Sequence, residues 1–167
     1  SSFSSSPGAV LVFLSGWDEI KAAHEALSAH GTFGDASKFE LLPLHSALPT
    51  ASQRRIFGRP PPGVRKVVLA TNIAETSITI DDVVFVVDLG RAKEKSYDPV
   101  NNLETLLPAW VSRAAARQRR GRAGRTQPGV CLRLYPQWKH DEEFRDFQEP
   151  ELLRTPLESI CLTIKTL

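Results

Sequence analysis

The sequence predicts an α/β fold built on a parallel sheet, and three observations support this prediction. Short apolar runs bounded by glycine, such as Ala9 to Leu14, are typical of strands that are buried on both faces. Apolar residues at helical spacing follow this run, from Asp18 to about His30. Strand and helix patterns then keep alternating along the chain, which favours parallel strands joined by helices on the faces of the sheet.

The other elements are expected in the same alternation. Strands are expected at residues 39–44, 66–70, 83–87 and 130–135, and helices at residues 50–57 and 111–120. Two extended segments, 93–97 and 103–107, flank a turn rich in Asp, Asn and Pro, which predicts a projecting β-hairpin. The serine-rich residues 1–8 are interpreted as a disordered tail or linker, and residues 137–155 as an acidic connector. Thr155, Pro156 and Glu158 have the pattern of a capping box, so a further helix is expected over 156–167.

Composition excludes several classes of protein. Of the 167 residues, 41% are hydrophobic and 24% are charged, which is the balance of an ordinary globular domain. The apolar runs are far shorter than the ~20 residues of a membrane span, so no membrane partner is expected. Two cysteines without CxxC spacing favour a reduced, intracellular setting. An HExxH-like pattern begins at His24 but has Ser28 in place of its second histidine, and no metal site is predicted.

Arginine is strongly concentrated in one part of the chain, although the net charge is only +2. Half of the fourteen arginines lie between residues 113 and 133, and no carboxylate lies between Glu104 and Asp141. If the run from 118 to 125 continues the predicted helix, Gln118, Arg122 and Arg125 share one face and can bind several phosphate oxygens. A solvated basic helix is the alternative, but its two glycines would each be unfavourable by ~1 kcal/mol.

A polar segment from Thr71 to Asp81 follows directly on the predicted strand at 66–70. Ligands of open α/β sheets bind at the carboxyl ends of the strands, where this segment would lie. In an extended conformation Ser77, Thr79 and Asp81 would point to the same side and offer hydroxyls and a carboxylate to a ligand. A plain loop, whose hydroxyls cap backbone groups, explains the composition equally well.

Four segments together resemble motifs IV, IVa, V and VI of the DEAH-box helicases, in the order found in that family. They are Phe13 to Ile20 (FLSGWDEI), Leu44 to Pro49 (LHSALP), Thr71 to Val83 (TNIAETSITIDDV) and Gln118 to Arg125 (QRRGRAGR). The resemblance covers nearly the whole chain from Gly8 onward and is greatest to the DEAH/RHA group, particularly its members that remodel RNA and G-quadruplexes. It implies that residues 9–136 form a helicase C-terminal RecA-like domain. Such a domain has a P-loop NTPase fold without its own P-loop, with helices on both sides of the sheet.

The resemblance also implies a role for individual residues. Arg122 and Arg125 would be arginine fingers at the γ-phosphate of ATP, and Gln118 would place the phosphate or the attacking water. Ser77, Thr79 and Asp81 would face the nucleotide, and Phe57 would stack on adenine. Gly16, Trp17, Thr71 and Asn72 are similar to elements that contact the RNA backbone. The hairpin between residues 93 and 107 resembles a strand-separating hairpin of the family, with a purely structural ornament as the alternative.

The implied function is that of a second motor domain, which closes on a first RecA-like domain around ATP and Mg²⁺. It would translocate on single-stranded RNA and unwind duplexes or G-quadruplexes, with DNA as a further option. The sequence contains neither GxxxxGK[ST] nor an Asp-Glu-x-His box, so the Mg²⁺ ligands are expected in the first domain and this chain alone is expected to be inactive. The helix from 156 would lead into a winged-helix domain. A catalytically inactive RNA-binding scaffold remains the alternative function, whereas a Rossmann-type binder is disfavoured because no GxGxxG follows the first strand.

Overall fold

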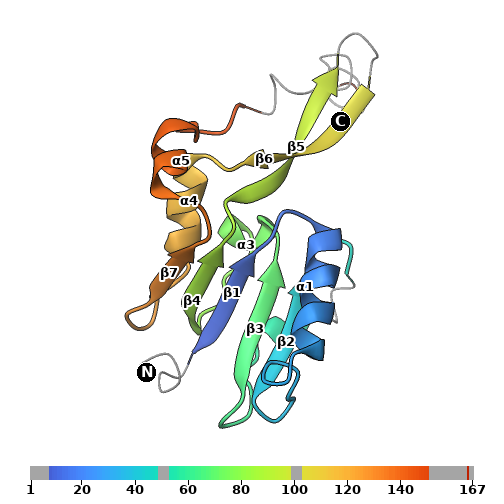
Figure 1. Cartoon of the computed structure of the whole chain (residues 1–167), viewed down its shortest axis with the longest axis vertical. Coiled ribbons are helices and arrows are strands. Elements are labelled where there is room, and N and C mark those ends of the chain that lie inside the picture. The colour runs from blue at the N-terminus through green and yellow to red at the C-terminus, as the bar shows by residue number, and fades with distance from the viewer. Residues whose placement is uncertain (1–7, 49–52, 99–102, 151–164, 166–167) are drawn as a thin grey trace.

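The computed structural model describes residues 8–48, 53–98, 103–150 and 165. Within these residues a five-stranded sheet in the order β2-β3-β1-β4-β7 forms the body of the molecule (Figure 1). Its strands are β1 (Ala9–Phe13), β2 (Phe39–Leu44), β3 (Arg65–Ala70), β4 (Val83–Asp88) and β7 (Val130–Arg133). Every neighbouring pair is parallel, which confirms the predicted fold class.

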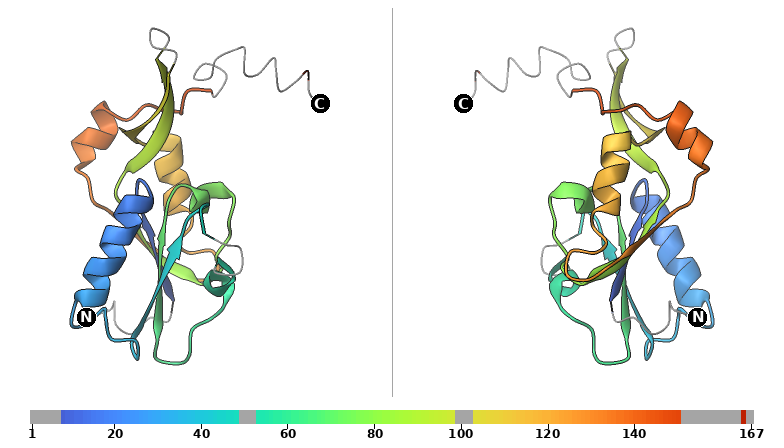
Figure 2. Two further views of the ribbon diagram at one scale, coloured as in Figure 1. Left: turned by 90° about the vertical axis from the view of Figure 1, so that its right-hand side faces the viewer. Right: turned by 90° about the vertical axis from the view of Figure 1, so that its left-hand side faces the viewer.

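Helices lie on both faces of this sheet, as Figure 2 shows. On one face α1 (Trp17–Ala29) packs Ile20 into a cluster with Val67 and Leu69 of β3. The opposite face carries the 3₁₀-helix η1 (Arg54–Phe57), α3 (Ile73–Thr76) and α4 (Arg113–Arg120). Their buried side chains, among them Ile56 and Ala74, join the main core with residues of the central strands. The sheet is therefore held between two helical layers.

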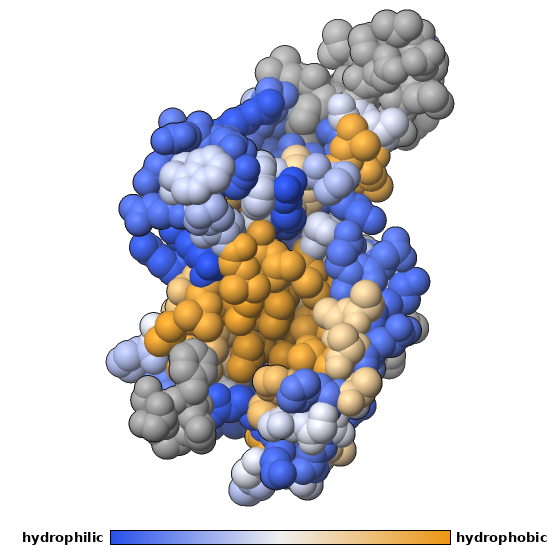
Figure 3. All heavy atoms as spheres, viewed as in Figure 1, coloured by the Kyte–Doolittle hydropathy of each residue, from blue (hydrophilic) through white to orange (hydrophobic). Residues whose placement is uncertain are grey.

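The layer formed by α1 covers only part of its face. Because side chains alternate along parallel strands, the register of β4 and β7 places Val130 and Leu132 on this face beside Phe85 and Val87. Val130 and Leu132 are each 43% exposed, and Leu134 beyond the end of β7 is 64% exposed. Figure 3 shows the corresponding apolar area over β1, β4 and β7.

A two-stranded antiparallel hairpin projects beyond the carboxyl end of the sheet, as predicted (Figure 1). It consists of β5 (Arg91–Asp98) and β6 (Leu103–Trp110), paired from Arg91 with Trp110 at its base. Gly90 leads from β4 into β5 with φ of +72°, and a Cβ atom there would lie 2.6 Å from the ring of Tyr135. This tight turn therefore requires glycine.

The segment expected to be a connector contains a helix and packs onto the domain. Residues 137–142 form α5 (Gln137–Glu142), and Phe144 beyond it is 2% exposed in a cluster at the base of the hairpin. Arg113 Nη1 binds Asp146 Oδ1 at 2.7 Å and fastens the following chain to the start of α4. α5 was not expected within this segment, because six residues are too few to show a helical period.

Other boundaries differ by small amounts or lie outside the described part of the chain. β7 ends at Arg133 rather than residue 135, and α4 begins after Ser112, whose Oγ accepts a hydrogen bond from Ala115 N at 3.1 Å. Of the helix expected at 50–57, the structure describes only residues 53–57, where η1 has 3₁₀ geometry. The expected tail at 1–7 and nearly all of the expected helix at 156–167 lie outside the described residues. None of the helices in the described ranges is long and apolar enough to span a bilayer.

Candidate functional site

The segment between β3 and β4 runs from one edge of the sheet to the other. Both strands pair in parallel with β1, so the chain leaves β3 at the carboxyl edge and must return to the amino edge before β4 begins. Thr71 and Asn72 lie at the carboxyl edge, whereas the carbonyl of Asp82 accepts a hydrogen bond from Ala9 N, at the start of β1, at 2.8 Å. The polar residues expected at one edge are therefore divided between two edges.

Four of the predicted site residues gather at the carboxyl edge. β1 and β3 are neighbours whose ends pair at Phe13 and Ala70, so the turns that follow them are adjacent. They place Gly16, Trp17, Thr71 and Asn72, the four residues expected to contact RNA, at the same edge of the sheet. Thr71 is 8% exposed, and Asn72 is exposed at the start of α3.

The carboxyl edge also adjoins the root of the hairpin. A Cβ atom on Gly16 would lie 2.7 Å from Cε of Lys93, so the turn after β1 and strand β5 are in direct contact. Trp17 packs its ring against His45, with 5.4 Å between the ring centroids. A single surface thus runs from the turns after β1, β2 and β3 to the hairpin.

A second group of predicted residues meets toward the amino edge. Arg125 Nη1 donates a hydrogen bond to Thr79 Oγ1 at 3.4 Å. The hydroxyl of Thr126 donates to the carbonyl of Asp81 at 3.1 Å. The arginine-rich run after α4 and the end of the 71–82 segment therefore lie side by side.

The arginine pair is not presented by a continuous helix, because the helix predicted at 111–120 ends there and the run from 118 to 125 does not extend it. α4 ends at Arg120, and Gly121 caps it by donating its backbone N–H to the Arg117 carbonyl at 2.9 Å. The chain then makes tight turns up to Gly124, whose φ of +83° is a backbone conformation that glycine adopts readily and other residues rarely do. Arg122 and Arg125 consequently project from a turn, while Gln118 remains exposed on the helix.

Arg122 is partly buried without a full set of partners. Its Nε and Nη1 atoms are inaccessible to solvent and have no hydrogen-bond partner among the described residues. Burial lowers the pKa of the Arg122 guanidinium, and the positive charge of Arg125 lowers it further. An arginine remains protonated in proteins, so two positive charges repel each other here. The Glu75 carboxylate offsets part of this repulsion, and an anion between the two arginines would relieve it further.

Three other residues predicted to act at the nucleotide, Phe57, Ser77 and Gln118, are not bonded to the arginine pair in the described structure. Phe57 is 57% exposed on η1. Ser77 is exposed at the C-terminal end of α3, and Gln118 is exposed on α4. Ser77 has helical backbone angles, so it does not alternate with Thr79 and Asp81 in the way an extended chain would. Within the described residues no hydrogen bond connects Phe57, Ser77 or Gln118 with Arg122 or Arg125.

Sequence reasoning missed a charge cluster around Arg119, in which Arg119 and Asp88 are fully buried and the Glu75 side chain is 14% exposed. The Arg119 side chain binds Glu75 at 2.7 Å and Asp88 at 2.8 Å, and Asp88 also accepts from the Tyr135 hydroxyl at 3.1 Å. Burial raises the pKa of the Glu75 carboxyl, and this outweighs the opposite effect of Arg119. Burial and the adjacent Asp88 carboxylate raise the pKa of Tyr135.

Two signals in the sequence could have revealed this cluster. Asp88 ends a strand that is otherwise apolar, and Arg119 follows Ala115 and Ala116 by four and three residues, on the buried side of the helix. Sequence analysis singled out Arg122 and Arg125 in this run and assigned no role to Arg119.

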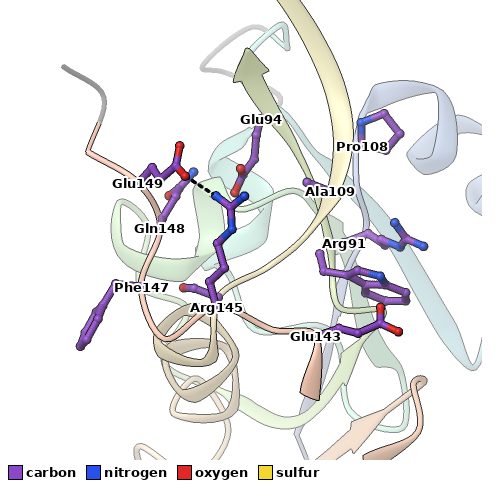
Figure 4. Close-up of a pocket in the computed structure, with 11 residues that line it drawn as sticks. Arg91, Glu94, Pro108, Ala109, Glu143, Arg145, Phe147, Gln148 and Glu149 are labelled. Carbon is purple, nitrogen blue, oxygen red and sulfur yellow. Dashed lines mark hydrogen bonds and ion pairs between the residues drawn. The ribbon is translucent and has the colours of Figure 1, made fainter. Parts of the chain in front are cut away.

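A pocket of about 340 Å³ lies at the base of the hairpin, away from the arginine pair (Figure 4). Figure 4 shows Arg91, Glu94 and Arg145 around it, and Arg145 binds Glu149 at 2.7 Å. Its charges are of both signs and partly paired with one another, so they do not define an anion site. The described residues hold no group of three or more His, Cys, Asp or Glu side chains arranged to bind a metal ion.

Comparison with known proteins gives a consistent result. Residues 3–127 match the model of the helicase conserved C-terminal domain. The chain is 60% identical over 161 residues to the DExH-box ATP-dependent RNA helicase DExH3 and 61% identical over 160 residues to DExH1, both from Arabidopsis thaliana. It is 55% identical over 160 residues to the ATP-dependent DNA/RNA helicase DHX36 of Homo sapiens. Each alignment covers 96% of this chain but only 13% to 16% of the relative.

All four segments quoted above lie within the matched residues 3–127. The parallel sheet, the projecting hairpin and the paired 71–82 and 118–125 segments are present together. The chain therefore belongs to the helicase conserved C-terminal domain family and is a RecA-like C-terminal helicase domain of the DExH/DEAH-box type.

Proposed function

We propose that this chain is the second motor domain of an ATP-dependent RNA helicase, with Arg122 and Arg125 acting on the γ-phosphate of ATP. The observation that carries the proposal is the unpartnered Arg122 group, which lies partly buried beside a second arginine. Such an arrangement has no structural use, because a buried donor without an acceptor is unfavourable. A phosphate oxygen would satisfy these donors.

The proposed role of the arginines is electrostatic. Negative charge spreads over the transferred phosphoryl group in the transition state, and a guanidinium aimed at it is worth ~10³ to 10⁵ in rate in related systems. The Thr79 hydroxyl accepts a hydrogen bond from Arg125 and holds its side chain. The carboxylate of Asp81, whose carbonyl binds Thr126, would bind the ribose or a water molecule. Gln118 and Phe57 would approach the nucleotide only when the first RecA-like domain closes. Mg²⁺ would be held by that first domain.

The carboxyl edge is the proposed RNA surface. Gly16, Trp17, Thr71 and Asn72 lie there, with Gly16 in contact with Lys93 of the hairpin, whereas Arg125 binds Thr79 near the other end of the 71–82 segment. Small and polar groups of this kind position a sugar-phosphate backbone without reading its sequence. The names of the relatives include RNA helicases and a DNA/RNA helicase. We therefore propose single-stranded RNA as the partner, with duplexes and G-quadruplexes as the structures that the parent unwinds.

A scaffold that only bound RNA is less well supported. It would need the carboxyl edge but would have no use for a partly buried guanidinium with two unpaired donors beside a second arginine. The proposed partners of the motor are the first RecA-like domain and a winged-helix domain of the same parent chain.

The test compares arginine variants of the full-length parent. Arg122→Ala and Arg125→Ala should each lower RNA-stimulated ATP turnover by ~10³-fold or more, measured as phosphate release, because the transition-state charge loses a partner. RNA affinity, measured by fluorescence anisotropy, should not change. Arg117→Ala removes the same charge from an exposed position on α4 and is the matched control. Normal turnover in both finger variants would show that the assignment is wrong.

A further inference from the structure

Arg119 lies in the middle of the arginine-rich run but points into the protein. Its side chain is 0% exposed, and its guanidinium carbon lies 4.8 Å from the ring centroid of Phe13 in β1. Nε donates to Glu75 of α3 at 2.7 Å, and Nη1 donates to Asp88 of β4 at 2.8 Å. The Arg91 carbonyl, in the first residue of the hairpin, accepts from Nη1 and Nη2 at 3.3 Å. One side chain thus joins α4, α3, β4 and the hairpin.

The Asp88 end of this cluster holds the hairpin a second time. Asp88 Oδ1 accepts a hydrogen bond from Gly90 N at 2.9 Å, in the turn that starts the hairpin. Its other oxygen accepts from Tyr135, whose ring packs against Phe144 at 5.0 Å between centroids. Arg91 also lies with its guanidinium 3.5 Å from the Trp110 ring, across the base of the hairpin. The root of the hairpin is therefore fixed to the buried guanidinium by its backbone.

The other end of the cluster leads directly to the two proposed sites. The backbone N–H of Arg122 donates to the Arg119 carbonyl at 3.1 Å, so the finger residue takes its position from Arg119. Glu75 lies in the single turn of α3, and its own N–H donates to the Asn72 carbonyl at 2.9 Å. A movement of Asn72 or of the hairpin must carry the guanidinium with it or break charge-assisted bonds in a dry interior.

Stability does not explain why these charges are buried. Removing two carboxylates and a guanidinium from water is expensive, and apolar side chains of similar volume often give equal or greater stability. The raised pKa of Glu75 shows that burial outweighs its attraction to Arg119. What such a cluster provides is a fixed mutual geometry, since the planar guanidinium offers donors in set directions to three separate elements.

We infer that Arg119, together with Glu75 and Asp88, is a positioning unit that couples the RNA edge and the hairpin to the finger arginines. RNA seated on Asn72 and against the hairpin sets the position of α3 and β5, and the buried guanidinium transmits that position to Arg122. This inference rests on the proposed function. Arg119 touches neither ATP nor RNA, so it is a positioning residue and not a catalytic one.

The experiment measures RNA stimulation in the full-length parent, defined as the ratio of ATP turnover with saturating RNA to turnover without RNA. Glu75→Gln keeps the shape of the side chain but removes the charge that links α3 to Arg119. Arg119→Lys keeps the charge but replaces the planar fork, which cannot then reach both carboxylates. Each variant should lower the ratio by roughly 2- to 30-fold, the range expected when a residue between two sites is altered.

Two comparisons separate coupling from simple loss of stability. Lys66 is the matched control, because it is also 0% exposed and binds Asp82 at 2.8 Å and the Ile56 carbonyl at 2.6 Å. It lies near the start of β3, at the opposite end of the sheet from the hairpin (Figure 1). Lys66→Met should lower the melting temperature and leave the ratio unchanged. In the double variant Glu75→Gln/Arg119→Lys the ratio should fall no further than in the worse single variant, because both act through one link.

The outcomes distinguish this inference from the proposed function. If Arg122→Ala abolishes turnover but Glu75→Gln and Arg119→Lys retain the normal ratio, the coupling is refuted and the motor assignment stands. If Arg122→Ala retains turnover, the proposed function itself fails. Should Arg119→Lys not fold, Glu75→Gln and Tyr135→Phe still test the link, since Tyr135→Phe removes only the hydroxyl that Asp88 accepts. An unchanged ratio in both of these would also refute the coupling.

Discussion

Arg119 and Arg122 are three residues apart, and only Arg119 is hydrogen-bonded to carboxylates. Arg119 comes from the buried side of α4 and meets Glu75 and Asp88, whereas Arg122 comes from the turn after the helix and leaves two donors unpaired. Arg117 and Arg120 are exposed on the same helix. The position of the helix end therefore decides which arginine forms buried ion pairs and which arginine keeps donors available for a ligand.

The exposed ring of Phe57 leads to a prediction for nucleotide binding. Phe57→Ala should weaken ATP binding to the parent about 5- to 150-fold, because stacking of a base on an aromatic ring is worth ~1 to 3 kcal/mol. The ring is 57% exposed, so its removal should leave the melting temperature nearly unchanged. Titration with a fluorescent ATP analogue would measure the affinity. Phe33→Ala, which removes another partly exposed ring at 37% exposure, is the control, and equal affinities of the two variants would contradict adenine stacking.

Single residues also show how far a sequence pattern can go. The hydrogen bond from Arg125 to Thr79 shows that the QRRGRAGR and TNIAETSITIDDV segments meet, whereas the roles expected of their residues stay predictions. The burial of Arg119 was not predicted, because two arginines in one run look alike until the packing of the helix is known. The expected alternation of Ser77 with Thr79 and Asp81 does not occur for a related reason. It requires an extended chain, and Ser77 has helical backbone angles at the end of α3.

The hairpin is the element whose geometry is most constrained at its base. Gly90 has φ of +72°, and an added Cβ atom would meet both Tyr135 and Phe144. The antiparallel pairing from Arg91 with Trp110 begins immediately after this turn. A change at Gly90 therefore acts on the whole hairpin and, through the neighbouring Asp88, on the buried cluster.

Gly90→Ala is predicted to destabilise the domain more than an equivalent change in open space. Backbone strain of this kind costs ~1 to 3 kcal/mol, and the collision with Tyr135 adds to it. Gly63→Ala is the matched control, because Gly63 also has positive φ, +85°, but a Cβ atom there meets nothing within 4 Å. Urea unfolding should give a lower midpoint for Gly90→Ala than for Gly63→Ala. Equal midpoints would contradict the prediction and show that Tyr135 and the turn at Gly90 can move to accommodate a Cβ atom.

Elements were predicted well where a long apolar pattern defined them and less well where tertiary contacts did. The parallel strands and α1 follow from apolar runs and helical spacing, and the hairpin follows from its turn residues. α5 is too short to show a period, and its place depends on Phe144 packing beside Tyr135 and Trp110. The tight turn after α4, from which Arg122 and Arg125 project, depends on Gly121 and on the contact of Gly124 with Val83.

At the scale of the whole molecule the chain holds one side of the proposed nucleotide site. It supplies the arginine pair, but its sequence contains no phosphate-binding GxxxxGK[ST] loop. We predict that the chain alone releases no phosphate from ATP above background, with or without RNA, whereas the full-length parent does so under the same conditions. A malachite-green assay would measure this. RNA-stimulated turnover by the chain alone would contradict the prediction.

The open face over β4 and β7 has a practical consequence for such experiments. β7 is the outer strand of the described sheet, and Val130, Leu132 and Leu134 expose apolar side chains on and beside it. An outer strand with a bare apolar face is a template for pairing with a second chain. A preparation limited to these residues would therefore form oligomers as its concentration rises, so sedimentation and activity should be measured over a dilution series.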